Sequence, residues 1–536
     1  MSIFDTVVFP KKKRNVFNLS HRFRGSAAFG NLYPIMCQEV LPGDSFQNQT
    51  SVFVRAMPML APLMHECNIY CHFFFVPNRL VWHNWKDFIT GGEDGTAEPV
   101  FPRMVLTGDD CKPKSLADYL GVGTNKDINQ DTTDTIHESF EVNALPFRAY
   151  SLIWNEFYRD QNLQDEVPID TGDGIDTTTN RGILTRNWEK DYFTSALPWT
   201  QRGPQSVLPI GTEAPVVLDN GGLNTQRVVT RTQSDGENLP VDEGFLMSDN
   251  GTLVNQDLSG NLNGDVLIDP NGTLIADLRN AVAANVNQLR VSLALQSWLE
   301  SNARGGARYI EQIFAHFGVT SSDARLQRPE FLGGSIQPLT ISEVLQTSAS
   351  TENSDLGDMA GHGISAGTSK QFRRFFEEHG FIIGILSIMP KTSYMNGTAR
   401  VFRKFDKFDY AFPEFANLGE QAVYNSEIYQ VSDNNGTGGI KYNDRTFGYQ
   451  SRYAEYKYVP NTVHGDLKTE AFSPWTLVRS FDNPPVLTGQ FVSADSNNND
   501  LGRIFPVTDS DTQFIFQCFH NLKAVRMLPK FAIPSI

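Results

Sequence analysis

The sequence has few cysteines, no long apolar run and a deficit of positive charge. Its five cysteines (Cys37, Cys67, Cys71, Cys111 and Cys518) are odd in number and irregularly spaced, which favours free thiols in a reducing compartment over a disulfide framework. The longest apolar stretch, FIIGILSIM at 381–389, is strand-sized, because a membrane-spanning helix needs about 20 apolar residues. No signal-like apolar segment precedes the basic residues near the N-terminus, so export is not expected.

Positive charge is scarce and unevenly placed. The chain has a net charge of −16, so it should not bind nucleic acid over its whole surface. Residues 1–30 nevertheless hold six basic side chains and one acidic one, a net +5, and are predicted to form an extended basic arm. Residues 205–276 hold ten acids, two arginines and one aromatic residue. This second stretch cannot supply much core and is predicted to be a loop-rich or partly disordered surface insertion.

Phenylalanine is abundant, at 38 residues, and three of these residues are adjacent in CHFFFVPNRLVWHNWKDFI at 71–89. Side chains alternate between the faces of a strand, so Phe73 and Phe75 share one face while Phe74 and Val76 share the other. We expect both faces of this strand to be covered, by a helix, a loop or another subunit. Pro77 should end the strand, because proline cannot donate to the ladder.

Strands are predicted at both ends of the chain, with helices and long loops between them. The N-terminal strands fall within 31–90, and 91–140 is turn-rich. A short helix is predicted near 145–160, and helical periodicity recurs over 277–317, where Gly305 and Gly306 interrupt it. Strands are expected again at FIIGILSIMP, IKYNDRTFGYQ, RYAEYKYVP and QFIFQCFHNLKAVRMLP. One β fold interrupted by large excursions follows from this pattern.

Two motifs suggest chemistry but have weaker support than structural interpretations. His65, Cys67, Cys71 and His72 resemble metal ligands, yet residues four apart on a strand lie roughly 13 Å from each other, so core thiols are favoured. GHGISAG at 361–367 matches the G-x-S-x-G pattern, with Ser365 as the nucleophile, and nearly matches a dinucleotide fingerprint. Neither a preceding strand nor a following buried helix is predicted, so a flexible glycine loop is favoured.

Two basic stretches are candidates for nucleic-acid contact. Lys11, Lys12, Lys13 and Arg14 could be a solvated tail or could bind phosphate, and the two interpretations are nearly balanced. FRKFDKFDY at 402–410 interleaves aromatic and basic residues as a surface for stacked bases would. Its two aspartates cancel much of the charge, so packing of the phenylalanines is favoured there.

Five long stretches resemble the major capsid proteins of the Microviridae, small single-stranded DNA bacteriophages, and their gokushovirus branch in particular. The stretches begin with NLSHRFRGSAAFGNLYPIMCQEVLPGDSF and AMPMLAPLMHECNIYCHFFFVPNRLVWHNWKDFI. They continue with WEKDYFTSALPWTQRG, ARGGARYIEQIFAHFGVTSSDARLQRPEFLGG and EEHGFIIGILSI, and only about 205–275 matches poorly.

The resemblance implies a mainly β protein, an eight-stranded antiparallel jelly roll with large loop and helical insertions. It implies a T=1 icosahedral shell around circular single-stranded DNA, assembled in the host cytoplasm, with neither catalytic residues nor a cofactor. The implied partners are copies of the chain, a small basic DNA-packaging protein, an internal scaffolding protein, a pilot protein and a host receptor. The implied organisation is an arm at 1–30 and a shell domain at 31–536, with insertions over about 91–370 and a protrusion at 205–275.

Two other function classes compete with the shell protein. One is a β-rich hydrolase that uses Ser365, which a serine-reactive probe would label. The other is a carbohydrate-binding β-sandwich, in which exposed aromatic residues such as Trp199 would bind sugar. Size-exclusion chromatography separates this last class, since a lectin would stay small.

Overall fold

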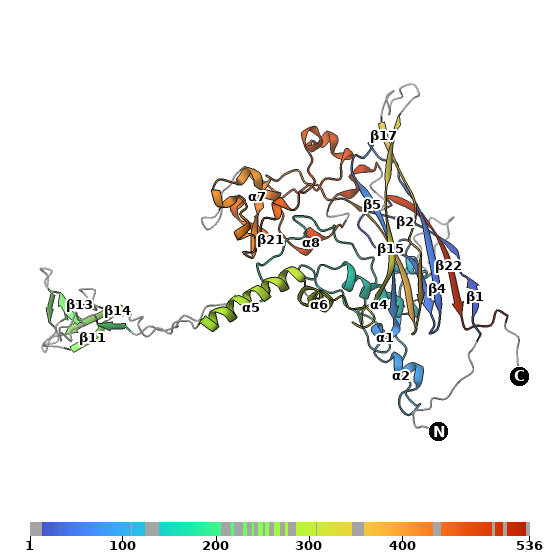
Figure 1. The fold of residues 1–536 in the computed structure, drawn as a ribbon, viewed down its shortest axis with the longest axis horizontal. Coiled ribbons are helices and arrows are strands. Elements are labelled where there is room, and N and C mark those ends of the chain that lie inside the picture. Colours follow the sequence, from blue (N-terminus) through green and yellow to red (C-terminus); the bar gives the residue numbers. More distant parts are fainter. Residues whose placement is uncertain are drawn as a thin grey trace. The chain divides into compact units, whose positions relative to one another are not determined.

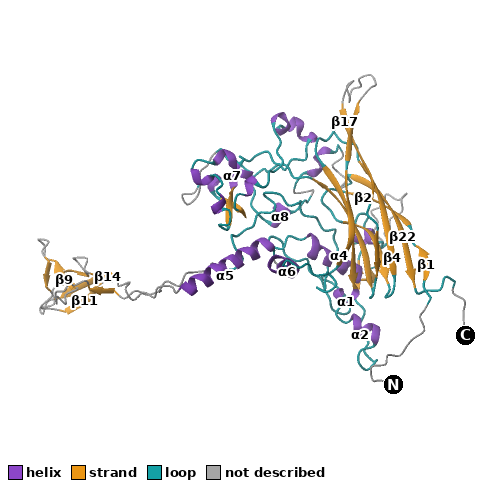
Figure 2. Cartoon of the chain, viewed as in Figure 1, coloured by secondary structure: helices purple, strands orange, loops and turns teal. Residues whose placement is uncertain are grey.

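The computed structural model describes residues 13–108, 110–123, 139–204, 286–306, 308–345, 359–432, 441–495, 499–506 and 512–531, and seven short strands within 216–276. The chain divides into two compact units, each described by itself. The larger consists of residues 1–202 with 300–536 and contains two large antiparallel sheets, several short helices and long loops (Figures 1 and 2). The smaller consists of residues 203–299.

The first large sheet has seven strands, and β22 and β4 lie side by side at its centre. Beyond β22 lie β1 and β2, and beyond β4 lie β17 and β18, while β16 pairs with β17. All these pairings are antiparallel. The bounds are β1 (Asn15–Asn18), β2 (His21–Ala27), β4 (Ser45–Ala56), β16 (Thr340–Leu345), β17 (Met359–Thr368), β18 (Phe372–Phe375) and β22 (Phe514–Arg526).

The second large sheet has four antiparallel strands in the order β15-β5-β19-β3. The bounds are β3 (Tyr33–Val40), β5 (Cys67–Pro77), β15 (Glu330–Pro338) and β19 (Gly380–Pro390). The prediction that the strand around Phe73 ends at Pro77 is confirmed. All eleven residues of β19 are buried, as are all but His72 of β5, so the centre of this sheet is covered on both faces.

The main core lies between the two sheets. Phe73 and Phe75 of β5 pack in the same cluster as Val54 of β4 and Phe514 and Phe516 of β22. Alternation along β22 buries every second side chain from Phe514 to Ala524, which is the expected pattern for a strand with one wet face. The two central strands of the four-stranded sheet, β5 and β19, have no such wet face.

Helices and loops of the same chain cover the other face of the four-stranded sheet. Phe74 and Val76 pack there with residues of α1 (Asn78–Val81), α4 (Leu145–Ile153) and the π-helix η1 (Trp154–Tyr158). The two faces of β5 are therefore both covered, as predicted, and the predicted helix near 145–160 is confirmed. The cover does not come from another subunit, because Phe73, Phe74 and Phe75 are at most 2 % exposed within one chain.

A buried ion pair fastens α4 to this layer. The Arg148 Nε donates to Asp176 Oδ2 over 2.7 Å, and both side chains are fully buried. The Arg148 Nη1 also donates to the carbonyl oxygens of Val81 and Gly172. Backbone and hydroxyl hydrogen bonds from Thr179 and the contact with Arg148 outweigh desolvation and lower the pKa of Asp176.

A third cluster, away from the two sheets, contains the predicted compact stretch 188–203 through Tyr192 and Phe193. The remaining elements of the larger unit are short. The helices among them are α2 (Trp85–Thr90), α3 (Leu116–Leu120), α6 (Tyr309–Phe317), α7 (Asn425–Ile428) and α8 (Gly489–Val492). The strands are β6 (Arg103–Leu106), β7 (Phe140–Asn143), β20 (Glu420–Tyr424) and β21 (Thr446–Ser451). The 3-10 turns are η2 (Arg400–Arg403), η3 (Lys407–Asp409), η4 (Pro413–Phe415), η6 (Tyr442–Asp444), η7 (Ala454–Tyr456), η8 (Gly465–Lys468), η9 (Glu470–Trp475) and η10 (Leu501–Ile504).

The smaller unit contains short antiparallel strands in the region predicted to be a loop-rich insertion. Five form a sheet in the order β10-β9-β13-β12-β11, and β14 pairs with β8. The bounds are β8 (Val216–Leu218), β9 (Val229–Thr232), β10 (Asn238–Pro240), β11 (Phe245–Asp249), β12 (Thr252–Gln256), β13 (Leu262–Ile268) and β14 (Leu274–Ala276). The helix α5 (Val286–Gly305) follows them in the chain.

Two local predictions are wrong. GHGISAG lies within β17 and is not a flexible loop. Its glycines are needed for close approach, since a Cβ on Gly361 would lie 2.4 Å from the Ala61 carbonyl oxygen. RYAEYKYVP is not a strand: Tyr453 has a φ of 60° and the chain turns into η7. The predicted break at Gly305 and Gly306 is confirmed, since it separates α5 from α6.

Candidate nucleic-acid interface

One face of the seven-stranded sheet carries five exposed basic side chains and no acidic one. Side chains of β22 such as Phe516 and Cys518 point into the core, so their neighbours in sequence point outward. Residues paired across neighbouring strands have their side chains on the same face of the sheet, so the pairing register assigns the residues of the other strands to the core side or the outward side. We call this outward side the open face. At its positions in the seven strands there is no Asp or Glu, and its cations are Arg22, Arg24, Arg55, Arg373 and Lys523.

Cross-strand register places these cations beside aromatic and amide groups. Arg22 is paired with Phe519, and its guanidinium lies 5.5 Å from the centroid of that ring. Arg24 is paired with Gln517, and the Arg24 Nε donates to the Gln517 side-chain oxygen over 2.9 Å. On the other side of Gln517 lies Phe53 of β4. The open face therefore alternates charged and apolar groups on a regular sheet.

Three phenylalanine rings of the open face are accessible. The exposed fractions are 42 % for Phe53, 38 % for Phe519 and 47 % for Phe375. Proteins that bind single-stranded nucleic acid without sequence preference combine a positively charged surface along the sugar-phosphate backbone with aromatic rings on which bases stack. The five cations would contact phosphates in the same way.

The predicted site residues lie partly on this surface. Lys11 and Lys12 lie outside the described residues. Lys13 and Arg14 are exposed and directly precede β1, which pairs with the edge of β22. The Arg14 guanidinium lies 5.2 Å from the Phe375 ring of β18, so this part of the arm is next to the open face.

Three cations of the open face were missed by the sequence analysis: Arg55, Arg373 and Lys523. They are isolated in sequence, and long-range strand pairing brings them together. Alternation within FIFQCFHNLKAVR would have placed Lys523 on an outward face. It could not have shown that Arg55 and Arg373 lie on the same face. A local run such as KKKR is visible in a sequence, whereas a basic sheet face is not.

The core beneath the open face is electrically neutral at His520. Its Nε2 lies 2.9 Å from the Ile35 carbonyl oxygen and must donate to it, so the Nδ1 accepts from the Thr50 hydroxyl over 2.8 Å. Burial, with a smaller contribution from the nearby His21, lowers the pKa of His520 to about 4. The positive charge of this region therefore lies on its surface.

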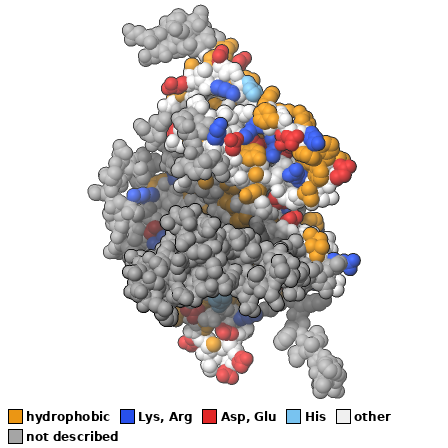
Figure 3. Space-filling view, turned by 90° about the vertical axis from the view of Figure 1, so that its left-hand side faces the viewer, with side chains coloured by type: hydrophobic (Ala, Val, Ile, Leu, Met, Phe, Trp, Pro, Cys, Tyr) orange, Lys and Arg blue, Asp and Glu red, His pale blue; other side chains and the backbone are white. Residues whose placement is uncertain are grey.

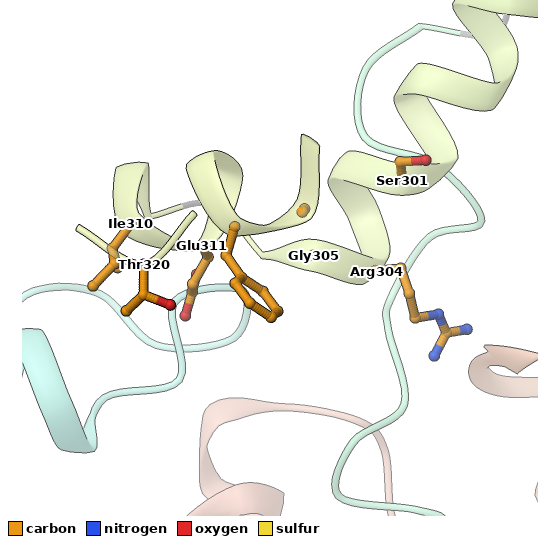
Figure 4. A pocket seen from close by; sticks show the side chains of 8 residues that line it. Ser301, Arg304, Gly305, Ile310, Glu311 and Thr320 are labelled. Carbon is orange, nitrogen blue, oxygen red and sulfur yellow. The ribbon is translucent and has the colours of Figure 1, made fainter. Parts of the chain in front are cut away.

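The larger unit also has an apolar groove between α6 and the C-terminal turn of α5 (Figure 4). It has a volume of about 670 Å³, and Ile310, Phe314 and Ala315 contribute apolar lining. Its two charged residues have partners elsewhere: Glu311 accepts from the Arg308 backbone N–H, and Arg304 pairs with Glu420. This groove offers no converging set of polar groups for catalysis.

Comparison with known proteins identifies the kind of chain that carries this face. Residues 7–536 match the family model Phage_F, described as capsid protein (F protein). The chain belongs to this phage capsid family. Capsid protein VP1 of Bdellovibrio phage phiMH2K is 35 % identical and that of Chlamydia phage 1 is 33 % identical, over at least 97 % of this chain and 95 % of theirs. Capsid protein VP1 of Spiroplasma virus 4 is 29 % identical over 98 % of this chain and 95 % of its own length.

These relatives confirm the resemblance to the Microviridae, and the chain is a structural component of a virion. Members of the capsid family are not enzymes, so the hydrolase hypothesis is wrong. The geometry agrees, because Ser365 lies within β17 and its hydroxyl donates to the Pro338 carbonyl oxygen over 2.7 Å. It is 4 % exposed and has no strand-to-helix elbow.

The metal-like residues on β5 are divided between its faces. Cys67 and Cys71 pack in the core between the sheets, while the His72 Nδ1 lies 2.8 Å from the Tyr158 hydroxyl. His65 donates its Nε2 proton to the Lys391 carbonyl oxygen. Among the residues that the structure describes, no His, Cys, Asp or Glu cluster could hold a metal ion. Burial raises the pKa of the Cys67 and Cys71 thiols, which favours the neutral form.

The residue on which the sugar-binding hypothesis rests, Trp199, is not a freely exposed aromatic ring. Trp199 is only partly exposed, its indole nitrogen is buried, and Arg202 lies 5.8 Å from its ring. No helix in the described part of the chain is long and apolar enough to cross a membrane.

Proposed function

We propose that copies of this chain form a T=1 icosahedral shell around circular single-stranded DNA, with the open face and the N-terminal arm directed toward the DNA. Membership of the capsid family supports the shell. Two facing antiparallel sheets of seven and four strands with a common core support a jelly roll as the shell domain, into which the helices and long loops are inserted, and its count of eight strands rests on the family resemblance. Assembly takes place in the host cytoplasm.

One observation carries the DNA contact. A chain with a net charge of −16 presents five exposed cations on a sheet face that has no carboxylate at its strand positions. Phosphate attraction depends on local potential, so such a face attracts DNA although the average charge of the subunit does not. Lys11, Lys12, Lys13 and Arg14 extend the same positive region from its edge.

The other parts of the proposal rest on the family resemblance. Residues 1–30 act as the arm, whose strands β1 and β2 join the seven-stranded sheet, and 31–536 act as the shell domain, with the excursions at about 91–370. Residues 205–275 form a variable surface protrusion, and surface loops contact a host receptor. The open face and the arm share Arg22 and Arg24 and together hold nine cations, too few to balance a packaged genome, so a small basic DNA-packaging protein shares this role. An internal scaffolding protein and a pilot protein complete the set of partners.

Alanine substitution of cations tests the DNA contact. Arg22→Ala/Arg24→Ala/Lys523→Ala should leave shells that assemble but release DNA at lower salt. Each phosphate contact contributes about 0.7 to the dependence of log affinity on log salt for a single strand, so the slope should fall by about 2. Alanine at the four arm residues should lower it by about 3. The slope is measured by titrating the subunit with a fluorescent oligonucleotide.

Lys86→Ala/Lys112→Ala/Lys468→Ala is the matched control, since it removes three exposed cations that lie off the open face. It should leave the slope unchanged. An equal loss of slope in the control would mean that only average charge matters. If the arm variant alone behaves like the wild type, the arm packs under a neighbouring subunit instead.

A further inference from the structure

A second surface of the larger unit exposes aromatic rings that a single chain leaves uncovered. It is built from η2, η3, the segment that leads to η4, and η7. We call it the aromatic surface, and its rings are 40–89 % exposed. They are Phe402 (74 %), Phe405 (89 %), Phe408 (53 %), Tyr410 (54 %), Phe412 (40 %) and Tyr456 (56 %). The expectation that the phenylalanines of FRKFDKFDY pack within the chain is therefore wrong.

Direct contacts join Tyr410, Phe412 and Tyr456, and Phe402, Phe405 and Phe408 lie in the chain segment that directly precedes them. The Lys404 ammonium lies 3.9 Å from the Tyr456 ring centroid and 5.6 Å from that of Tyr410. The Phe412 backbone N–H donates to the Tyr453 hydroxyl, and the Tyr453 and Tyr456 rings are 6.3 Å apart. Hydrophobic side chains interspersed with both signs of charge are also visible on the face of the molecule in Figure 3.

The backbone of this surface is fixed before any partner arrives. The Asp409 carboxylate accepts the backbone N–H groups of Phe405 and Asp406, each over 2.8 Å. These bonds lower the pKa of Asp409 and hold the turn that presents Phe405. Preorganisation of this kind reduces the ordering cost of association.

Two of the three cations in FRKFDKFDY, Arg403 and Lys404, and the adjacent Arg400 are paired with carboxylates of the same chain. Arg403 pairs with Asp444 over 2.6 Å, Lys404 with Glu455 over 3.4 Å, and the adjacent Arg400 with Glu427 over 3.2 Å. Phosphate groups would therefore find little free positive charge here. Apolar rings with internally satisfied charges are instead characteristic of the core of a protein–protein interface.

The area matches a specific protein contact. With about 200 Å² for a fully exposed aromatic side chain, the six rings present roughly 700 Å². The largest apolar patch on a typical monomer is about 300–600 Å², and a stable interface buries about 800 Å² on each partner. A chain of the capsid family meets copies of itself in a shell, so a copy is the partner that this surface would meet most often.

We infer that the aromatic surface is a contact between copies of this chain, with Phe405 inserted into the neighbouring subunit. The inference rests on the proposed shell. Phe405 is the most exposed of the rings, and a charge at its position would have to be buried in the contact. Because it is exposed in the single chain, its replacement should not affect folding of the subunit.

Phe405→Asp tests this in shells made by cells that express the whole phage genome. The variant subunit should keep the circular dichroism spectrum and melting temperature of the wild type but yield at least tenfold fewer shells. Phe405→Leu, the matched control, keeps an apolar side chain and should assemble. Equal shell yields from Phe405→Asp and the wild type would overturn the inference and leave the proposed function intact. Absence of shells even from the wild type would count against the proposed function itself.

Photo-crosslinking identifies the occupant directly. A benzoylphenylalanine at position 405 should give, in irradiated shells, a product of twice the chain mass. A chain–DNA adduct would assign the surface to the genome, and an adduct with another virion protein would assign it to that protein. Either adduct in place of the dimer, or no adduct at all, overturns the contact between copies.

Discussion

The open face and the aromatic surface expose the same types of side chain but differ in how their charges are compensated. Arg22, Arg24 and Lys523 lie on a sheet face without carboxylates, whereas Arg403 and Lys404 have acidic partners within 3.5 Å. Aromatic and basic residues together thus do not define a nucleic-acid site. The presence or absence of a local carboxylate decides whether the same residue types favour phosphate or another protein.

Removing rings from the open face should have the largest effect on DNA binding. Base stacking on an aromatic ring is worth about 1–3 kcal/mol, so Phe53→Ala/Phe519→Ala should weaken oligonucleotide binding at least tenfold without changing the salt slope. Phe402→Ala/Phe408→Ala on the aromatic surface is the control and should leave this affinity unchanged. Fluorescence anisotropy measures both, and equal weakening by the two variants would remove the distinction between the surfaces.

Acid should lower the free energy of unfolding of the subunit, because the buried His520 beneath the open face is neutral in the folded state. The pKa of His520 is about 4 in the folded chain and about 6.5 when unfolded, so the unfolded state binds the extra proton between these values. Stability is therefore full above pH 6.5 and falls as the pH drops toward 4, by at most about 1.4 kcal/mol per pH unit. In thermal melts, His520→Gln should show a smaller decrease between pH 7 and 5. An unchanged decrease would exclude this histidine as the cause.

Removing the carboxylate partners of the cations on the aromatic surface should have the smallest effect on oligonucleotide binding. Asp444→Asn/Glu455→Gln removes the partners of Arg403 and Lys404 without changing side-chain size. Oligonucleotide affinity should rise a few-fold at low salt and return to the wild-type value at high salt, because salt screens the attraction between these cations and the phosphates. Asp87→Asn/Asp466→Asn, with two exposed acids from other turns, controls for net charge. The same rise in this control would show that carboxylate position is irrelevant.

Local patterns allowed much of the fold to be predicted. Alternation around Phe74 predicted a strand covered on both sides, and Gly305 and Gly306 predicted the break between two helices. The glycine pattern GHGISAG was misleading because its meaning depends on distant contacts. Gly361 and Gly363 are small because Ala61, Met59 and Ala56 approach them, which a single sequence cannot reveal. The candidate site could be predicted only where its cations fall within the basic stretch 1–30, at Lys13, Arg14, Arg22 and Arg24.

The strand order has a consequence for synthesis of the subunit on the ribosome. At the centre of the seven-stranded sheet, β4 pairs with β22, which is translated several hundred residues later. At about 5–20 residues per second, the first of these strands waits tens of seconds for the second. Prematurely terminated chains lack β22 and with it the neighbour of β1 and β2. The sheet can thus close only in chains translated through residue 526, which excludes most truncated products from the pool of competent subunits.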